Sequence, residues 1–267
     1  MSRRRPGDIV LWHFQGSHFC EKARWALDWK KIPHVRQVLG ASYLPRAFLR
    51  TGRGTLPVLC LGRQTIGDST QIIEALEHYR ADPPLYPEKD IDKERCLALE
   101  TYFDEELGHP VRAAAFLQPL ARDPNWIAGF AASGLGDLQQ RVFSAIAPVF
   151  CKIYRSRHGI TAATAESGRV KVAAVLDRIT EETQPSGYLV GDSFSVADLT
   201  AAALLASILG VPDLEYPLPE PIPASILEYR QSLAAHPSAQ WVHDIYRRHR
   251  GTSAEIQVSR RAAPRSV

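Results

Sequence analysis

The N-terminal third of the chain alternates short apolar runs with segments of helical periodicity. Ile9-Val10-Leu11-Trp12 has no polar interruption, which predicts a buried strand in a sheet covered on both faces. Apolar residues at 19, 23, 26 and 27 then form one stripe, which predicts a helix to about Lys30. The same criteria predict strands at 35–39, 57–61 and 64–66 and helices at 41–50 and 69–79, in the order βαβαββα.

Beyond residue 90 every long periodic segment is helical. Apolar positions recur with helical spacing in the stretches Leu138–Val149 and Val172–Ile179. The segment 199–209 is apolar nearly all round, and Ser195-Val196-Ala197-Asp198 places a capping box directly before it. We therefore expect this helix at the buried centre of an all-α bundle, followed by a proline-rich turn at 212–223 and two short closing helices.

The pattern divides the chain into two domains joined by a proline-rich segment. The predicted parts are a basic N-terminal tail at 1–7, an α+β domain at 8–80, a linker at 81–90, an all-helical domain at 91–250, and a disordered tail at 251–267. A length of 267 residues with 45% apolar and 23% charged residues fits globular domains and excludes disorder for the bulk of the chain.

Charge and hydropathy exclude several function classes. The net charge of +3 is accounted for by arginines in the two tails, so a basic nucleic-acid surface is not expected on the folded body. No apolar run reaches the roughly 18–20 residues of a membrane span, and no apolar signal region follows Met1. We expect a cytoplasmic protein without a membrane or nucleic-acid partner.

The cysteine pattern points to neither a disulfide framework nor a metal site. The four cysteines are far apart and form no Cys-x-x-Cys pair, so no zinc site is predicted and reduced thiols are expected: Cys20, Cys60, Cys96 and Cys151.

Three short motifs carry candidate chemistry. Ser17 lies where the first strand gives way to the first helix. Its hydroxyl and the unpaired backbone N–H groups of the helix start can hold a thiolate; alternatively, the serine only caps the helix. Leu56-Pro57 opens a strand after a glycine-rich loop, and the sequence leaves the isomer of this bond open. Asp68-Ser69 opens another helix, either as an ordinary cap or as a site for a ligand with an ammonium and a carboxylate.

The order of these motifs within βαβαββα resembles the thioredoxin-like domain of cytosolic glutathione transferases with a serine-type active site. The segment Gly191–Asp198 resembles the helical C-terminal half of the same family. The resemblance covers about residues 8–250. It implies a thioredoxin-like N-terminal domain, an all-α helical-bundle C-terminal domain, and glutathione as co-substrate without a metal.

The resemblance also assigns roles to single residues. It implies that Ser17 hydrogen-bonds the glutathione sulfur, and that Leu56, with a cis bond to Pro57, pairs its backbone with the cysteinyl part. Asp68 would bind the γ-glutamyl ammonium and Ser69 its carboxylate. Arg53, followed by Arg50, is the candidate for the glycyl carboxylate.

The chain departs from the family at two positions of this turn. His18 stands where many serine-type members have proline, and it faces either solvent or the thiol. Cys20 stands where redox-active relatives keep the second cysteine of Cys-x-x-Cys, but without a cysteine at position 17 no internal disulfide can form. A small apolar residue on the first helical turn is the alternative for Cys20.

Together these features predict an enzyme that activates the thiol of glutathione for attack on a small apolar electrophile. The electrophile pocket is predicted to involve Phe14, Tyr102, Phe103 and His109. The alternatives are a non-catalytic glutathione-binding or interaction protein with the same fold and a glutathione-dependent thiol oxidoreductase that uses Cys20. The family resemblance further implies a two-fold homodimer.

Overall fold

A computed structural model describes residues 9–212 and 214–256 of the chain. The predicted tails at 1–7 and beyond 256 lie outside the described residues. The N-terminal domain has the predicted βαβαββα order: β1 (Val10–His13), α1 (His18–Trp29), β2 (Val35–Val38), α2 (Tyr43–Thr51), β3 (Val58–Leu61), β4 (Gln64–Gly67) and α3 (Ser69–Tyr79). A short 3-10 turn at Gly40–Ser42 precedes α2, so the helix predicted to begin at residue 41 begins at 43.

The four strands form one mixed sheet in the order β2-β1-β3-β4. β1 runs parallel to β2 and antiparallel to β3, and β3 runs antiparallel to β4. Alternate residues of β1 point to opposite faces: Leu11 packs in the cluster that contains residues of α1 and α3, whereas Val10 and Trp12 pack with Ala47 of α2. Both faces of the sheet are therefore covered, which explains the uninterrupted apolar run of β1.

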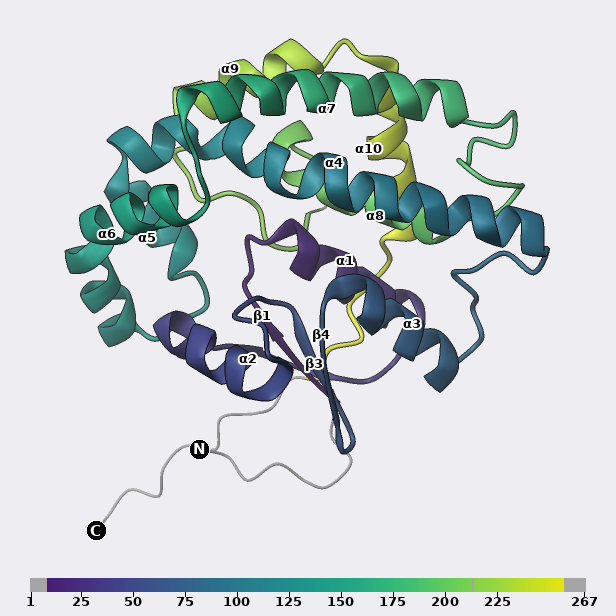
Figure 1. The fold of residues 1–267 in the computed structure, drawn as a ribbon, viewed down its shortest axis with the longest axis horizontal. Helices are drawn as coiled ribbons and strands as arrows, with labels where there is room; N and C mark the ends of the chain where they lie inside the picture. Colours follow the sequence, from purple (N-terminus) through teal and green to yellow (C-terminus); the bar gives the residue numbers. More distant parts are fainter. Residues whose placement is uncertain (1–8, 213, 257–267) are drawn as a thin grey trace.

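The C-terminal domain is all-helical, as predicted. Its helices are α4 (Asp90–Arg122), α5 (Pro124–Ala131), α6 (Asp137–Arg157), α7 (Ala162–Glu182), α8 (Val196–Leu209), α9 (Ala224–Leu233) and α10 (Pro237–His249). In Figure 1, α4 and α7 run side by side above the N-terminal domain, and α5 and α6 lie to one side of it, beyond α2. Within the described residues, no helix is long and apolar enough to cross a membrane.

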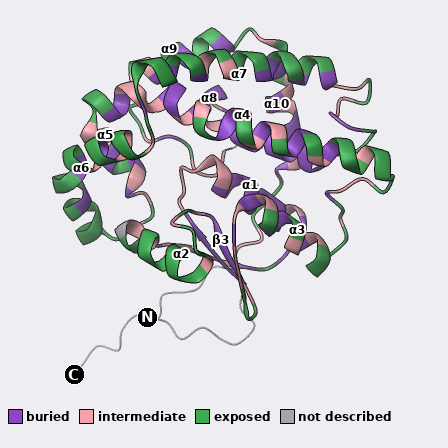
Figure 2. Cartoon of the chain, in the orientation of Figure 1, coloured by how far each residue is buried: buried purple, intermediate pink, exposed green. Residues whose placement is uncertain are grey.

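Helix α8 lies at the centre of the C-terminal domain, as its apolar sequence predicts. All its residues except Ser207 are buried. The capping box is formed: the Ser195 backbone N–H and hydroxyl donate to Asp198 Oδ2 at 2.9 and 2.8 Å. Helix α1 of the N-terminal domain packs directly on α8, and its Trp25 stacks on Phe194 just before α8. The two domains therefore share one apolar core, which Figure 2 shows in purple.

Helix α6 buries fewer of its regularly spaced apolar side chains than its sequence suggests. Five large apolar side chains lie along one exposed stripe, with spacings of three or four residues: Leu138, Val142, Ile146, Val149 and Ile153. These side chains are between 45% and 74% exposed. The helix itself is as predicted, but the opposite face, with Phe143, Ala147 and Cys151, is the one that packs into the domain.

Residues 251–256, which were predicted to belong to a disordered tail, instead pack on the N-terminal domain. The Ala254 backbone N–H donates to Asp28 Oδ1 at 2.8 Å, and the Ile256 N–H donates to the His34 carbonyl at 2.7 Å. Glu255 forms a bridge with His34 beside β2. Composition alone did not reveal these contacts because their partners lie more than 200 residues away along the chain.

Candidate active site at the strand-to-helix edge

The sheet brings the three predicted motifs to one edge. Trp12 of β1 pairs with Val58 of β3, and Val58 pairs with Gly67 of β4. Trp12 lies five positions before Ser17, Val58 lies two positions after Leu56, and Gly67 directly precedes Asp68. β1 and β4 both end at this edge and β3 begins there, so the starts of α1 and α3 and the Leu56-Pro57 turn converge.

Ser17 caps helix α1. Its Oγ accepts a hydrogen bond from the Cys20 backbone N–H at 3.3 Å, and its own N–H donates to the Phe14 carbonyl at 3.2 Å. The Ser17 hydroxyl also lies within hydrogen-bond reach of the Cys20 thiol, and this contact lowers the pKa of that thiol against the larger effect of burial. The capping role is thus present, and the hydroxyl can still donate to a ligand at the positive end of the helix.

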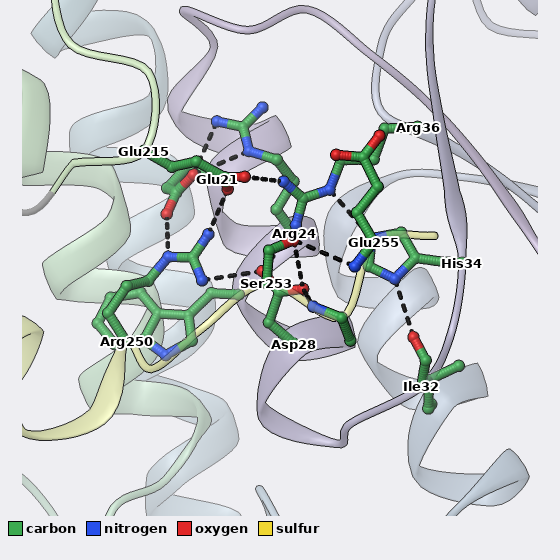
Figure 3. Close-up of polar contacts among 12 residues, drawn as sticks. Glu21, Arg24, Asp28, Ile32, His34, Arg36, Glu215, Arg250, Ser253 and Glu255 are labelled. Atoms are coloured by element: carbon green, nitrogen blue, oxygen red, sulfur yellow. Dashed lines mark hydrogen bonds and ion pairs between the residues drawn. The ribbon is translucent and has the colours of Figure 1, made fainter. Parts of the chain in front are cut away.

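The turn that carries Ser17 is held from behind by Arg24, a buried residue one and a half turns into α1. Its guanidinium donates to the Gln15 carbonyl at 3.0 Å and to the Phe14 carbonyl at 3.3 Å. It also pairs with Glu21 at 2.7 Å, which in turn pairs with Arg250 at 2.6 Å. Figure 3 shows Glu21 between the two arginines and the larger network that they join. The position of the turn therefore depends on a buried ionic network that reaches the C-terminal segment.

The Leu56–Pro57 bond is cis, as the resemblance implies. Pro57 is buried, and Leu56 is half-buried and precedes the first residue of β3. The backbone groups of Leu56 have no hydrogen-bond partner within the described residues. An extended peptide at this edge could pair with them as one strand pairs with the next.

Asp68 and Ser69 form the N-terminus of α3. Asp68 Oδ1 accepts from the backbone N–H groups of Thr70 and Gln71 at 3.1 and 3.4 Å, so the residue is a cap. Its φ of 104° is unfavourable for a residue with a side chain, a type of strain that clusters at ligand sites. Ser69 is buried, and its hydroxyl has no partner among the described residues.

Arg53, the candidate for the glycyl carboxylate, instead pairs with Asp68. Its Nη1 lies 3.0 Å from Asp68 Oδ2, and both side chains are largely exposed. The structure thus brings Arg53 to the γ-glutamyl side of the predicted site. Arg50 is exposed on the last turn of α2.

A polar cluster that sequence reasoning missed lies directly behind the N-terminus of α3. The Lys22 ammonium, fully buried on α1, lies 2.8 Å from Glu100 and 2.7 Å from Asp104 of α4. The Thr70 hydroxyl contacts all three side chains, at 2.8 to 3.0 Å. The cluster fixes α1, α3 and α4 relative to one another beside Ser69. The sequence did contain a signal for this cluster: Glu100 and Asp104 are four residues apart, which places both carboxylates on the same face of α4.

The predicted electrophile residues do not form one group. Phe14 lies beside the Ser17 turn and packs edge to face on Phe130 of α5, with ring centroids 5.3 Å apart. Phe103 is 0% exposed in the main core, and Tyr102 lies near Lys171 and Arg178 of α7. His109 is exposed on α4. The structure therefore keeps Phe14 and His109 near the turn but takes Tyr102 and Phe103 away from it.

The region between the Ser17 turn, α4 and the end of α6 is basic. Arg112 of α4 donates to His158 Nδ1 of α6 at 3.2 Å, and the His109 and His158 rings are 6.4 Å apart. His18 belongs to the same group, because burial and the charge of Arg112 lower its pKa to about 3. The Nε2 atom of His18 is buried without a hydrogen-bond partner among the described residues. His18 therefore faces the interior of the domain interface rather than solvent.

Cys20 does not have the surroundings of a reactive thiol. The side chain is 0% exposed, its sulfur accepts from the Phe14 N–H at 3.4 Å, and burial raises its pKa. Reactive cysteines are accessible and have a lowered pKa. Within residues 9–212 and 214–256, no group of three or more His, Cys, Asp or Glu is arranged to hold a metal ion.

Comparisons with known proteins agree with this architecture. Residues 11–84 match the sequence profile of the glutathione S-transferase N-terminal domain, and residues 142–237 match that of the glutathione S-transferase C-terminal domain. No curated protein sequence matches the chain significantly.

Similar solved structures cover nearly the whole chain at low sequence identity. The β-etherase LigF from Sphingobium sp. strain SYK-6 is 18% identical with a TM-score of 0.58, covering 88% of this chain and 98% of its own. A glutathione S-transferase from Methylobacterium radiotolerans, in complex with glutathione sulfonate, is 22% identical with a TM-score of 0.53, covering 87% and 93%. A bacterial maleylpyruvate isomerase is 18% identical with a TM-score of 0.54, covering 90% and 95%.

At these identities the solved structures establish the fold. The two domain profiles follow each other in the expected order, and together they match well over half of the sequence. The chain belongs to the glutathione S-transferase family.

Proposed function

We propose that this protein is a glutathione transferase that uses Ser17 to stabilise the thiolate of bound glutathione. The observation that carries the proposal is the convergence of Ser17, Leu56 and Ser69 at one edge of the sheet. The Leu56 backbone and the Ser69 hydroxyl have no partner within the described residues, and the Ser17 hydroxyl caps α1 beside them. Two of the three lie at helix N-termini, where anions are favoured.

In the proposed complex, glutathione lies along this edge. The Ser69 hydroxyl and N–H bind the γ-glutamyl carboxylate, and Asp68 binds the ammonium. Because Asp68 already pairs with exposed Arg53, the ammonium would exchange with or add to that ion pair. The Leu56 backbone pairs with the cysteinyl unit, which brings the sulfur towards Ser17.

Ser17 then donates its hydroxyl hydrogen to the sulfur and lowers the free energy of the thiolate. The thiol proton leaves to solvent, the sulfur forms a bond to the electrophilic carbon, and the leaving group departs with its electron pair. Arg24 does not touch the reactants in this scheme; it keeps the carbonyls of the preceding turn in place. The buried Cys20 thiol, with its raised pKa, disfavours the oxidoreductase alternative.

Replacing Ser69 with alanine tests the placement of glutathione. We expect the variant to bind glutathione more weakly by about 1.5–3 kcal/mol, because a hydrogen bond to a charged carboxylate is lost. Isothermal titration calorimetry measures this difference, and Ser144→Ala, an exposed helical serine on α6, serves as the control. Equal affinities of the wild type and Ser69→Ala would contradict the assignment. A wild type that binds glutathione but conjugates no electrophile would instead support the non-catalytic alternative.

We also propose a two-fold homodimer in which the N-terminal domain of one chain contacts the C-terminal domain of the other. Support comes from exposed apolar side chains on both domains, since monomers rarely expose large apolar patches. Phe48 and Leu49 on α2 are 60% and 83% exposed, and the stripe on α6 adds five more apolar residues. A two-fold symmetric dimer would bury the same apolar surfaces on both chains.

The double variant Val142→Glu/Val149→Glu is expected to be monomeric where the wild type is dimeric. Both changes place a carboxylate in the middle of the exposed stripe of α6, where burial in an interface would cost the charge its hydration. Light scattering at micromolar concentration measures the mass. Val170→Glu, a change of a single exposed valine on α7, is the matched control and should leave the mass unchanged. A monomeric wild type would refute the dimer.

A further inference from the structure

Helix α4 runs along the candidate site. Glu100, Asp104, Gly108 and Arg112 follow one another at intervals of four residues, each step advancing about 6 Å along the helix axis and turning about 40° around it. The first two contact Lys22, beside the N-terminus of α3. At Gly108 the ring of Phe19 is so close that an added Cβ would lie 2.5 Å from it, so the first turn of α1 rests directly on α4.

Arg112 therefore lies about one helical turn along α4 from Gly108, which contacts Phe19 of α1. It lies further from the N-terminus of α3 than Gly108 does. Glutathione bound as proposed runs from Ser69 to Ser17. In the proposed complex an electrophile must meet the sulfur beside this part of α4, so Arg112 is the next residue of the series that could reach it. Phe14, three residues before Ser17, packs edge to face on Phe130.

The charge of Arg112 is not neutralised by the described residues. Among the described residues its guanidinium donates to a histidine ring nitrogen, His158 Nδ1, and no ion pair joins it to a carboxylate. A guanidinium keeps its charge at all ordinary pH values. Because Arg112 is only half-buried and His109 beside it is exposed, the cation can be reached from solvent.

The surrounding groups are neutral and add no anion. Burial and the charge of Arg112 lower the pKa of His158 to about 4 and that of His18 to about 3, and they also lower that of His109. Burial raises the pKa of Tyr154, whose ring lies 4.4 Å from that of His158. The electrostatic influences on these histidines come from arginines and from one another, with no carboxylate among them.

We infer that the electrophile carries an anionic group such as a carboxylate, and that Arg112 binds it. This inference rests on the proposed function, because it assigns the substrate class of that site. A bound carboxylate would pair with the free N–H groups of Arg112. The cation would then have an anionic partner, which it lacks among the described residues.

Binding of an unreactive pair of probes tests the inference without turnover. In the presence of glutathione, the wild type is expected to bind 3,5-dinitrobenzoate more tightly than 3,5-dinitrobenzamide, which has nearly the same shape but no charge. Arg112→Met should lose about tenfold to hundredfold in affinity for the benzoate, the effect of one charge-assisted hydrogen bond, and keep its affinity for the benzamide. Arg122→Met, an exposed arginine at the end of the same helix, should behave as the wild type.

Turnover of the corresponding chlorinated pair links the same residue to reaction. With 4-chloro-3,5-dinitrobenzoate and its amide, the carbon–sulfur bond forms, the carbon–chlorine bond breaks and chloride leaves. Arg112→Met should lower kcat/KM for the benzoate about tenfold or more and change that for the amide less than about threefold. Arg112→Lys should recover part of the loss for the benzoate.

The outcomes separate this inference from the proposed function. Equal affinity of the wild type for benzoate and benzamide, or an unchanged preference in Arg112→Met, overturns the anionic substrate class. Preserved glutathione binding in Arg112→Met shows that the variant is folded. A wild type that prefers the benzoate but conjugates neither chlorinated probe keeps the anion site and refutes the transferase activity.

Discussion

Arg250→Met is expected to lower the free energy of unfolding by about 3–5 kcal/mol, the cost of leaving buried charges without their partner. Arg250 is 5% exposed and lies 2.6 Å from Glu21, 2.8 Å from Asp28 and 2.9 Å from Glu215. Methionine fills similar space but leaves the carboxylates of Glu21 and Asp28 buried, with only Arg24 and Arg36 to balance them. Chemical denaturation followed by circular dichroism measures the difference.

The pH dependence of this difference identifies its electrostatic origin. Burial alone would raise the pKa of Glu21, but Arg250 and Arg24 outweigh burial and hold that pKa well below its usual range. A depressed folded-state pKa stabilises the protein above the unfolded-state value of about 4.3, and this stabilisation is lost progressively as the pH falls below it. The difference between the wild type and Arg250→Met should therefore be largest near neutral pH and shrink in acid.

Arg247 provides a matched control three residues away. Its side chain is 68% exposed and pairs only with Asp244 on the same helix, so Arg247→Met should change the stability by less than about 1 kcal/mol. Similar losses in both variants would contradict the assignment, because a general effect on α10 would then explain them. A loss in Arg250→Met that does not change with pH would also contradict it.

The sequence revealed those parts of the fold whose cause is local. The apolar run of β1, the helical stripe of α1 and the capping box of α8 each depend on neighbouring residues, and each element lies where it was predicted. The Arg250 network could not be read in this way, since Arg250 and Glu21 are 229 residues apart. Only the fold brings the end of α10 against α1.

Periodicity predicted helices more reliably than it predicted which side of a helix is buried. On α6, the apolar stripe that predicts the helix is largely exposed, because the chain packs the neighbouring face into the domain. On α4, the adjacent Tyr102 and Phe103 were both predicted to line the electrophile pocket, but Phe103 is fully buried in the main core and Tyr102 lies near Lys171 and Arg178 of α7. The sequence does not show how α4 is rotated about its own axis. The series of residues from Glu100 to Arg112 could therefore not be placed beside the proposed site from the sequence alone.

Ser17→Ala is expected to reduce glutathione conjugation at neutral pH by about tenfold or more, because the thiolate loses one charge-assisted hydrogen bond of about 1.5–3 kcal/mol. At about 1.36 kcal/mol for each unit, the pKa of the bound thiol should rise by about one to two units. The Ser17 hydroxyl is half-buried at the N-cap of α1, whereas the Cys20 thiol is fully buried three residues further along the helix. Titration of the thiolate absorbance of bound glutathione measures this pKa.

Ser17 also caps α1, so Ser17→Ala should cost about 1 kcal/mol of stability whether or not the serine touches the sulfur. Stability therefore does not distinguish the two roles, and the thiol pKa does. Ser17→Thr keeps a hydroxyl at the cap and should retain a low thiol pKa, whereas Cys20→Ala should leave the pKa unchanged. If the pKa instead moves in Cys20→Ala and stays fixed in Ser17→Ala, Ser17 is only a cap and the buried cysteine must become accessible in the working enzyme.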